Sequence, residues 1–175
     1  MKYVLLICLS LLFISDERPL IWSDAYRLEW SDFKANPKSR STVVAVTASG
    51  ITFSYTTKKS NSGLIDYNFQ VEAHFYPEQS WYVKDRVNRI HLSHERLHFD
   101  ITELCARKFR KEISNTKFTN HVNREMDAIY QEITDGLRNM QNLYDEESSH
   151  SINVGNQKKW EKYIALELEK LVHYR

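Results

Sequence analysis

Hydrophobic and polar residues follow two different periods along this chain, and the change falls near residue 80. Between residues 42 and 57, and again between Tyr67 and Phe75, apolar residues alternate with polar ones. A period of two predicts strands with one buried face. A shorter alternation covers Leu28–Phe33, and the polar stretch 58–63 predicts a turn. The first half of the chain is therefore expected to form an antiparallel sheet.

After Trp81, apolar residues recur at every third or fourth position, which is the spacing of one helix face. The polar stretch 145–156 interrupts this pattern and is expected to be a loop. Three helices are predicted, over residues 85–113, 118–140 and 160–171. Strands followed by helices indicate an α+β fold, in which the sheet packs on the first long helix and two further helices follow. We expect one domain, from residue 16 to 175.

The first fifteen residues have the features of a secretory signal peptide. Lys2 provides a positive charge, Tyr3–Ile14 is apolar except for Ser10, and Ser15–Arg18 is polar. The apolar run is shorter than the roughly 20 residues that a membrane-spanning helix needs. We therefore expect residues 1–15 to be a signal peptide and the mature protein to be exported, as a secreted or periplasmic protein. Only this segment is expected to contact a membrane.

Composition excludes several classes of protein. The net charge of +1 provides no basic surface for nucleic acid, and four glycines and three prolines are too few for a disordered chain. Ten tyrosines, eight phenylalanines and four tryptophans are sufficient for a hydrophobic core. Cys105 is the only cysteine outside the first fifteen residues, so the mature chain can form no internal disulfide. Its place within the first predicted helix favours a buried position.

The first predicted helix contains His94-Glu95-Arg96-Leu97-His98, an H-E-x-x-H motif. Residues four apart lie on one face of a helix, so both imidazoles can bind the same ion. A catalytic zinc site has three protein ligands and one water. Glu95 lies next to the first histidine, where it can take a proton from the water without binding the metal. We therefore expect a Zn²⁺ site with His94 and His98 as ligands and Glu95 as the general base.

The third ligand has to come from another part of the chain. Asp100 and Glu103 lie off the face that carries the histidines, and Glu103 is placed to pair with Arg107. Glu125 and Glu132 lie on the second predicted helix, where exposed carboxylates are common. None of these is favoured as a ligand.

The residues that follow the second predicted helix offer better candidates. His150 is the preferred third ligand, because a histidine in a loop can fold over a helix face and imidazole suits zinc. Asp145 is the second choice, as a ligand or as a residue that orients one. Tyr144 is either a hydrogen-bond donor to a developing oxyanion or a core residue. His91, about 60° around the helix from His94, is expected to line the groove or to pack.

Three blocks of sequence resemble a bacterial family of predicted secreted zinc-dependent proteases, catalogued as a domain of unknown function. The blocks are Leu28–Lys34 with Pro37 and Thr47–Ile51; Ser80–Trp81 with His94–Glu103 and Arg107; and Tyr144–Asp145 with Glu147–Ser148, His150, Gln157 and Trp160. The resemblance implies zinc at His94 and His98, Glu95 as acid and base, and importance for Tyr144, Asp145 and His150. This chain departs from the family pattern at Ser148, where the family has Thr, and at Ser151, where it has Gly. The second change can alter the backbone angle beside His150.

Together these features predict a zincin-like, zinc-dependent metallopeptidase that acts on a peptide or protein substrate. The ion activates a water, and Glu95 takes the proton and passes it to the leaving amine. An exposed sheet edge, such as the strand ending at Phe75, is expected to hold the extended peptide. Two alternatives remain open: a metal-dependent amidase that acts on cell-wall peptides, and a non-catalytic cell-envelope protein with a structural zinc site.

Overall fold

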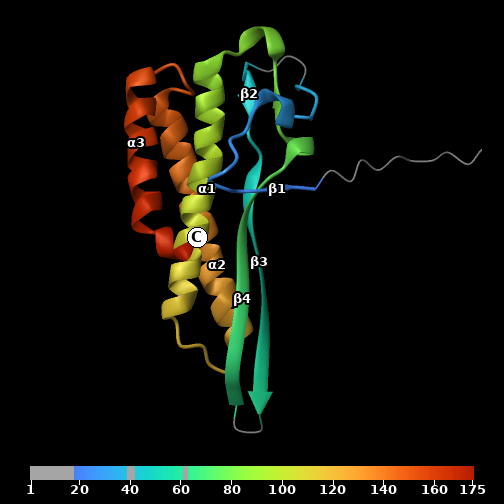
Figure 1. The fold of residues 1–175 in the computed structure, drawn as a ribbon, viewed down its shortest axis with the longest axis vertical. Helices are drawn as coiled ribbons and strands as arrows, with labels where there is room; N and C mark the ends of the chain where they lie inside the picture. Colours follow the sequence, from blue (N-terminus) through green and yellow to red (C-terminus); the bar gives the residue numbers. More distant parts are fainter. Residues whose placement is uncertain (1–17, 39–41, 61–62) are drawn as a thin grey trace, which may run out of the picture.

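An antiparallel sheet and three long helices form the two layers of the molecule (Figure 1). The computed structural model describes residues 18–38, 42–60 and 63–175, so the predicted signal peptide lies outside the described residues. The helices are α1 (Arg89–Asn115), α2 (Val122–Ser148) and α3 (Val154–Lys170). The predicted α+β class is confirmed: the strands come first in the chain, and the sheet packs on the helix that carries the H-E-x-x-H motif. No helix in the described part of the chain is apolar over the length that a bilayer requires.

The sheet is built around one long hairpin. Strands β3 (Ser49–Ser60) and β4 (Gly63–Phe75) pair in antiparallel fashion, with Ser49 opposite Phe75. The short strand β1 (Leu20–Ile21) pairs with the other side of β4, again at Phe75. The strand order is therefore β1-β4-β3. This corrects the expectation that the strand ending at Phe75 offers a free edge, because β4 has a neighbour on both sides at that position.

A second, two-stranded sheet lies close to the start of α1. It pairs β2 (Ala45–Val46) with β5 (Trp81–Tyr82). The alternation at Leu28–Phe33 does not form a strand, because Trp30–Asp32 is a turn of 3₁₀ helix. Leu28 and Phe33 are buried, and the ring of Trp30 stacks on Tyr82 with centroids 4.7 Å apart. The alternation at Leu28–Phe33 therefore reflects which side chains of this non-strand segment point into the core. Further 3₁₀ turns cover Pro77–Gln79, Lys84–Arg86 and Val172–Tyr174.

Polar side chains define where the helices begin. The side chain of Asn88 accepts hydrogen bonds from the backbone N–H groups of Ile90 and His91, at 2.8 and 3.2 Å, and so caps α1. The side chain of Asn153 accepts from the backbone of Asn156 at 3.1 Å and caps α3. Helix α1 therefore begins four residues later than predicted, and α3 begins six residues earlier.

Helix α2 continues eight residues beyond the predicted end at Met140. In this last part only Tyr144 and Ser148 are buried, which is about one residue per turn. The apolar period therefore disappears from the sequence although the backbone remains helical. The first residue of the polar stretch that was expected to be a loop, Asp145, lies on this helix.

The core has two parts, one on each side of α1. One lies between the sheet, α1 and α2 and contains Phe75, Phe109 and Met126, together with Cys105, as predicted. The other lies between α1, α2 and α3, next to the H-E-x-x-H motif. Because α1 is covered on both sides, even its charged residues are buried: Glu103 forms ion pairs with Arg107 at 2.9 Å and with Arg110 at 3.0 Å. Paired charges of this kind avoid the penalty of an isolated buried carboxylate.

Candidate metal centre

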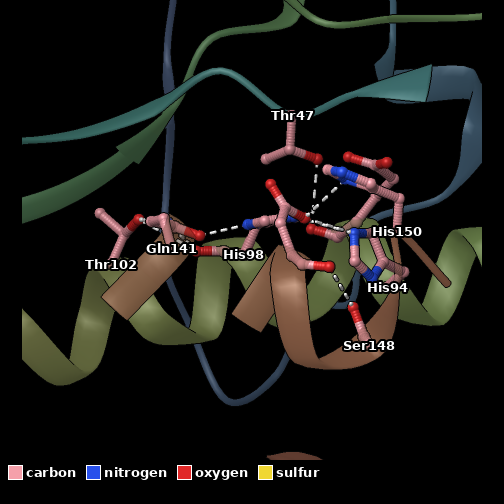
Figure 2. A network of polar contacts seen from close by, with 9 residues as sticks. Thr47, His94, His98, Thr102, Gln141, Ser148 and His150 are labelled. Atoms are coloured by element: carbon pink, nitrogen blue, oxygen red, sulfur yellow. Dashed lines mark hydrogen bonds and ion pairs between the residues drawn. The ribbon is translucent and has the colours of Figure 1, made fainter. Parts of the chain in front are cut away.

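Three side chains from α1 and α2 bring potential ligand atoms together. The Nε2 atoms of His94 and His98 lie 3.1 Å apart, and Oδ1 of Asp145 lies 3.0 Å from the first and 3.1 Å from the second. Figure 2 shows the two histidines on the same side of α1, beneath the chain segment that contains Thr47. Among the residues that the structure describes, these three form the one His, Cys, Asp and Glu group with ligand atoms close enough to hold a metal ion.

The spacing of these atoms fits a tetrahedral ion. Donors at about 2.0–2.1 Å from a tetrahedral zinc lie roughly 3.3–3.4 Å from one another. The observed separations of 3.0 and 3.1 Å are only a few tenths of an ångström shorter. Two imidazoles and one carboxylate also form the ligand set of many catalytic zinc sites, in which the fourth position stays open. The residues present therefore fit a metal ion.

Gln141 of α2 fixes the orientation of His98. Its Oε1 accepts a hydrogen bond from Nδ1 of His98, and its Nε2 donates to the backbone oxygen of the same residue at 2.9 Å (Figure 2). In the neutral ring, a proton on Nδ1 leaves the lone pair on Nε2, the atom that faces Asp145; in the charged ring, Nε2 also carries a proton and donates to Asp145. Residues that orient a metal-binding histidine commonly bond its second nitrogen in this way. The sequence reasoning missed Gln141. Its spacing of four from Asp145, which places both on one face of a helix, was the available signal.

Ring packing holds His94. Its ring stacks on Tyr144 with centroids 4.5 Å apart and planes inclined by 25°, and the ring of His98 meets Tyr144 edge-on at 5.1 Å. The Nδ1 atom of His94 is buried and has no hydrogen-bond partner within the described residues. Tyr144 thus packs against both imidazole rings and limits their rotation.

This position indicates that Tyr144 is a core residue and not a hydrogen-bond donor to an oxyanion. Its side chain is 0% exposed, packs between His94 and Trp160, and does not line the cavity above the cluster. Burial raises the pKa of its hydroxyl far above the ordinary value. That hydroxyl has no hydrogen-bond partner in the described part of the chain. The predicted catalytic role is therefore corrected to a packing role, because the hydroxyl is buried and does not border the cavity.

The structure reverses the expected order of the third ligands. Asp145 belongs to the cluster because α2 continues past it and directs its carboxylate at the two histidines. His150 lies beside the cluster: its Nδ1 is 3.6 Å from Oδ1 of Asp145, and its side chain is 78% exposed. Its backbone N–H donates to the backbone oxygen of Asp145 at 2.9 Å. His150 is thus held at the rim, and its binding to the ion stays a prediction.

The chain beside His150 adopts an unusual conformation. Ser149, His150 and Ser151 all have positive φ angles, of 49°, 50° and 74°. Residues with a Cβ atom lose about 1–2 kcal/mol each in this left-handed region. Ser151 thus retains the backbone region that a glycine would adopt, so the departure from the family pattern leaves the chain in strain there.

The charges of the cluster favour a cation. Burial alone would raise the pKa of Asp145, but the hydrogen bonds from His94 and His98 lower it well below its ordinary value. Burial alone would lower the pKa of His98, but the hydrogen bond to Asp145 and the charges of Glu95 and Asp145 raise it above the ordinary value. An ionised carboxylate between two imidazoles therefore attracts positive charge, as a proton or as a metal ion.

A cavity of about 870 Å³ opens above the cluster. Glu95 lines it and is only 5% exposed, and its backbone oxygen accepts a hydrogen bond from Oγ1 of Thr47 at 3.2 Å. This bond holds the segment 42–47 against α1. His91 also lines the cavity, as expected for a groove residue.

Three of the four carboxylates that were not favoured as ligands have structural partners instead. Asp100 accepts hydrogen bonds from Trp22 and Arg27, Glu103 pairs with Arg107 and Arg110, and Glu125 accepts from Thr119. Glu132 is exposed on α2.

Comparison with models of protein families gives a match. The family model described as bacterial protein of unknown function (DUF922) covers residues 24–151, which include the cluster, Glu95 and His150. No curated protein and no solved structure matches the chain. Because the family model covers well over half of the sequence, the chain belongs to this bacterial family.

Proposed function

We propose that this member of the bacterial family DUF922 is a zinc-dependent metallopeptidase. The observation that carries the proposal is the convergence of His94, His98 and Asp145 at the wall of a cavity, with Glu95 next to them. Zinc is the preferred ion because two imidazoles and a carboxylate at these spacings match its tetrahedral ligand set. When bound, it would supply the positive charge that activates a water and polarises a peptide carbonyl.

Glu95 is the residue that would transfer the proton. It follows the first histidine directly in the chain, lines the cavity and is not one of the three converging donors. It is 5% exposed, and its charge acts on the nearby rings of His91 and His98. Within the described residues, no direct hydrogen bond or ion pair of its side chain accounts for a carboxylate at this position. A general base accounts for it: Glu95 takes a proton from water and passes it to the leaving amine.

The walls of the cavity suit an extended peptide. The segment 42–47 forms one wall, and β2 within it pairs with a described strand, β5, on one side only. A substrate in extended form can add to the other side through backbone hydrogen bonds. The apolar residues of the cavity would then contact substrate side chains; they are Val43, Val44, Ala45, Val46, Leu137 and Ile152. This edge replaces the β4 edge that was expected from the sequence.

The test combines metal analysis with hydrolysis of a broad peptide library. Wild-type protein is expected to bind one zinc per chain and to cleave some of the peptides. Glu95→Gln should retain the zinc and lose hydrolysis, whereas the matched change Glu132→Gln, at an exposed residue of α2, should retain both. A zinc-loaded wild-type protein that cleaves no peptide would refute the peptidase proposal, and an active Glu95→Gln variant would refute the role of the base.

A further inference from the structure

His91 is a titratable residue of the cavity that the proposed mechanism leaves unused. It lies four residues before Glu95 on α1, so the two side chains are neighbours on the helix surface, with Cβ atoms about 5–6 Å apart. Both residues line the cavity. His91 is not one of the three converging donors.

The cap of α1 determines which nitrogen of His91 carries the proton. The backbone N–H of Asn88 donates to Nδ1 of His91 at 3.0 Å, while the side chain of Asn88 accepts from the backbone of His91. A nitrogen that accepts a hydrogen bond carries no proton, so the neutral ring has its proton on Nε2. Burial lowers the pKa of His91, and although the charge of Glu95 opposes this, the neutral ring is favoured at pH 7. Because the capping hydrogen bond occupies Nδ1, the neutral ring offers Nε2–H as a hydrogen-bond donor.

We propose that Nε2–H of His91 donates a hydrogen bond to the substrate carbonyl oxygen as negative charge develops on it during hydrolysis. The inference rests on the proposed peptidase function and supplies the donor that Tyr144 cannot provide. A neutral imidazole is suited to this position because it adds no positive charge that would repel a metal ion in the same cavity. Fixed donors of this kind contribute about 10²–10³-fold to kcat.

Two substitutions at His91 separate the proposed donor, Nε2–H, from the capping hydrogen bond at Nδ1. His91→Asn keeps an acceptor where Nδ1 lies, and so keeps the capping bond, but loses the donor at Nε2. His91→Gln places an amide N–H near the position of Nε2 but loses the capping bond. With zinc bound, kcat is expected to fall about 10²-fold in His91→Asn, with little change in KM, and to recover in part in His91→Gln. An exposed histidine outside the cavity provides the comparison: His121→Ala, at the start of α2, should retain the activity.

A measurement that needs no activity reads the tautomer directly. Nitrogen-15 NMR of the metal-free wild-type protein at neutral pH should show His91 protonated on Nε2 alone. A proton on Nδ1, or a charged ring, would overturn the inference. So would an active wild type in which His91→Asn retains its kcat, or in which His121→Ala lowers kcat as much as His91→Asn does. A wild type that binds zinc but cleaves nothing would instead remove the proposed function, and the NMR result would then describe a helix cap only.

Discussion

Replacing Gln141 with leucine tests whether the metal centre depends on support from outside the three donors. Leucine has a similar volume and keeps the helix, but it removes both hydrogen bonds between Gln141 and His98. The ring of His98 then loses the partner that directs its Nε2 lone pair at Asp145. The backbone oxygen of His98 also loses the N–H donor that Gln141 provides. We expect Gln141→Leu to weaken zinc binding without unfolding the protein.

The magnitude follows from the two bonds. Loss of a residue that orients a metal-binding histidine weakens metal affinity by about 10–100-fold, which corresponds to about 1.4–2.7 kcal/mol. Each polar group left unpaired in a buried place costs about 1–3 kcal/mol of stability. The side chain of His98 is 12% exposed, so water can satisfy its Nδ1 only in part. The variant should therefore melt at a lower temperature and still fold.

The assay is a competition titration against a fluorescent zinc chelator at fixed pH, with circular dichroism to verify the fold. Gln131→Leu is the matched control, because Gln131 also lies on α2 but is exposed, and its side chain bonds Asp135 of the same helix rather than the cluster. The control should bind zinc like the wild type. A folded Gln141→Leu variant with an unchanged zinc Kd would show that the contact to His98 does not support the site.

Three further predictions concern the neighbourhood of the site and the core. Asp145→Asn should weaken zinc binding by more than the roughly 100-fold upper limit for an orienting residue, whereas His150→Ala should leave it nearly unchanged; the opposite result in the same titration would make His150 the ligand. Ser151→Gly should relieve backbone strain and, after the added entropy of the unfolded chain, stabilise the protein by about 0.5–1 kcal/mol; a calorimetric Tm that falls would contradict this. Burial raises the pKa of Cys105 to about 11, so its reaction with a thiol reagent at pH 8 should be about 10²-fold slower in the native state than in urea and should accelerate as pH rises. Equal rates in both states would show that Cys105 is exposed.

The part of the site that could be predicted from sequence is the part that is local. The spacing of His94 and His98 within one helix fixes their common face, and Glu95 follows from its place between them. The third donor lies 47 residues beyond His98. Its identity depends on how α2 crosses α1, and the H-E-x-x-H motif does not encode that crossing. The preference for His150 rested on the chemistry of its side chain alone, without knowledge of where the backbone places it.

The end of α2 was misjudged for a related physical reason. The apolar residues that face the core along this helix include Met126, Ile133 and Leu137, and the same face continues with Gln141 and Asp145 at helical spacing. The change from apolar to polar marks the point where the face of α2 leaves the core and begins to line a cavity. At such a boundary the core-facing positions of a helix change from apolar to polar residues, while the backbone stays helical. Polar residues that continue an apolar stripe at intervals of three and four therefore indicate a helix beside a site, and in this chain that criterion would have selected both Asp145 and the glutamine that supports His98.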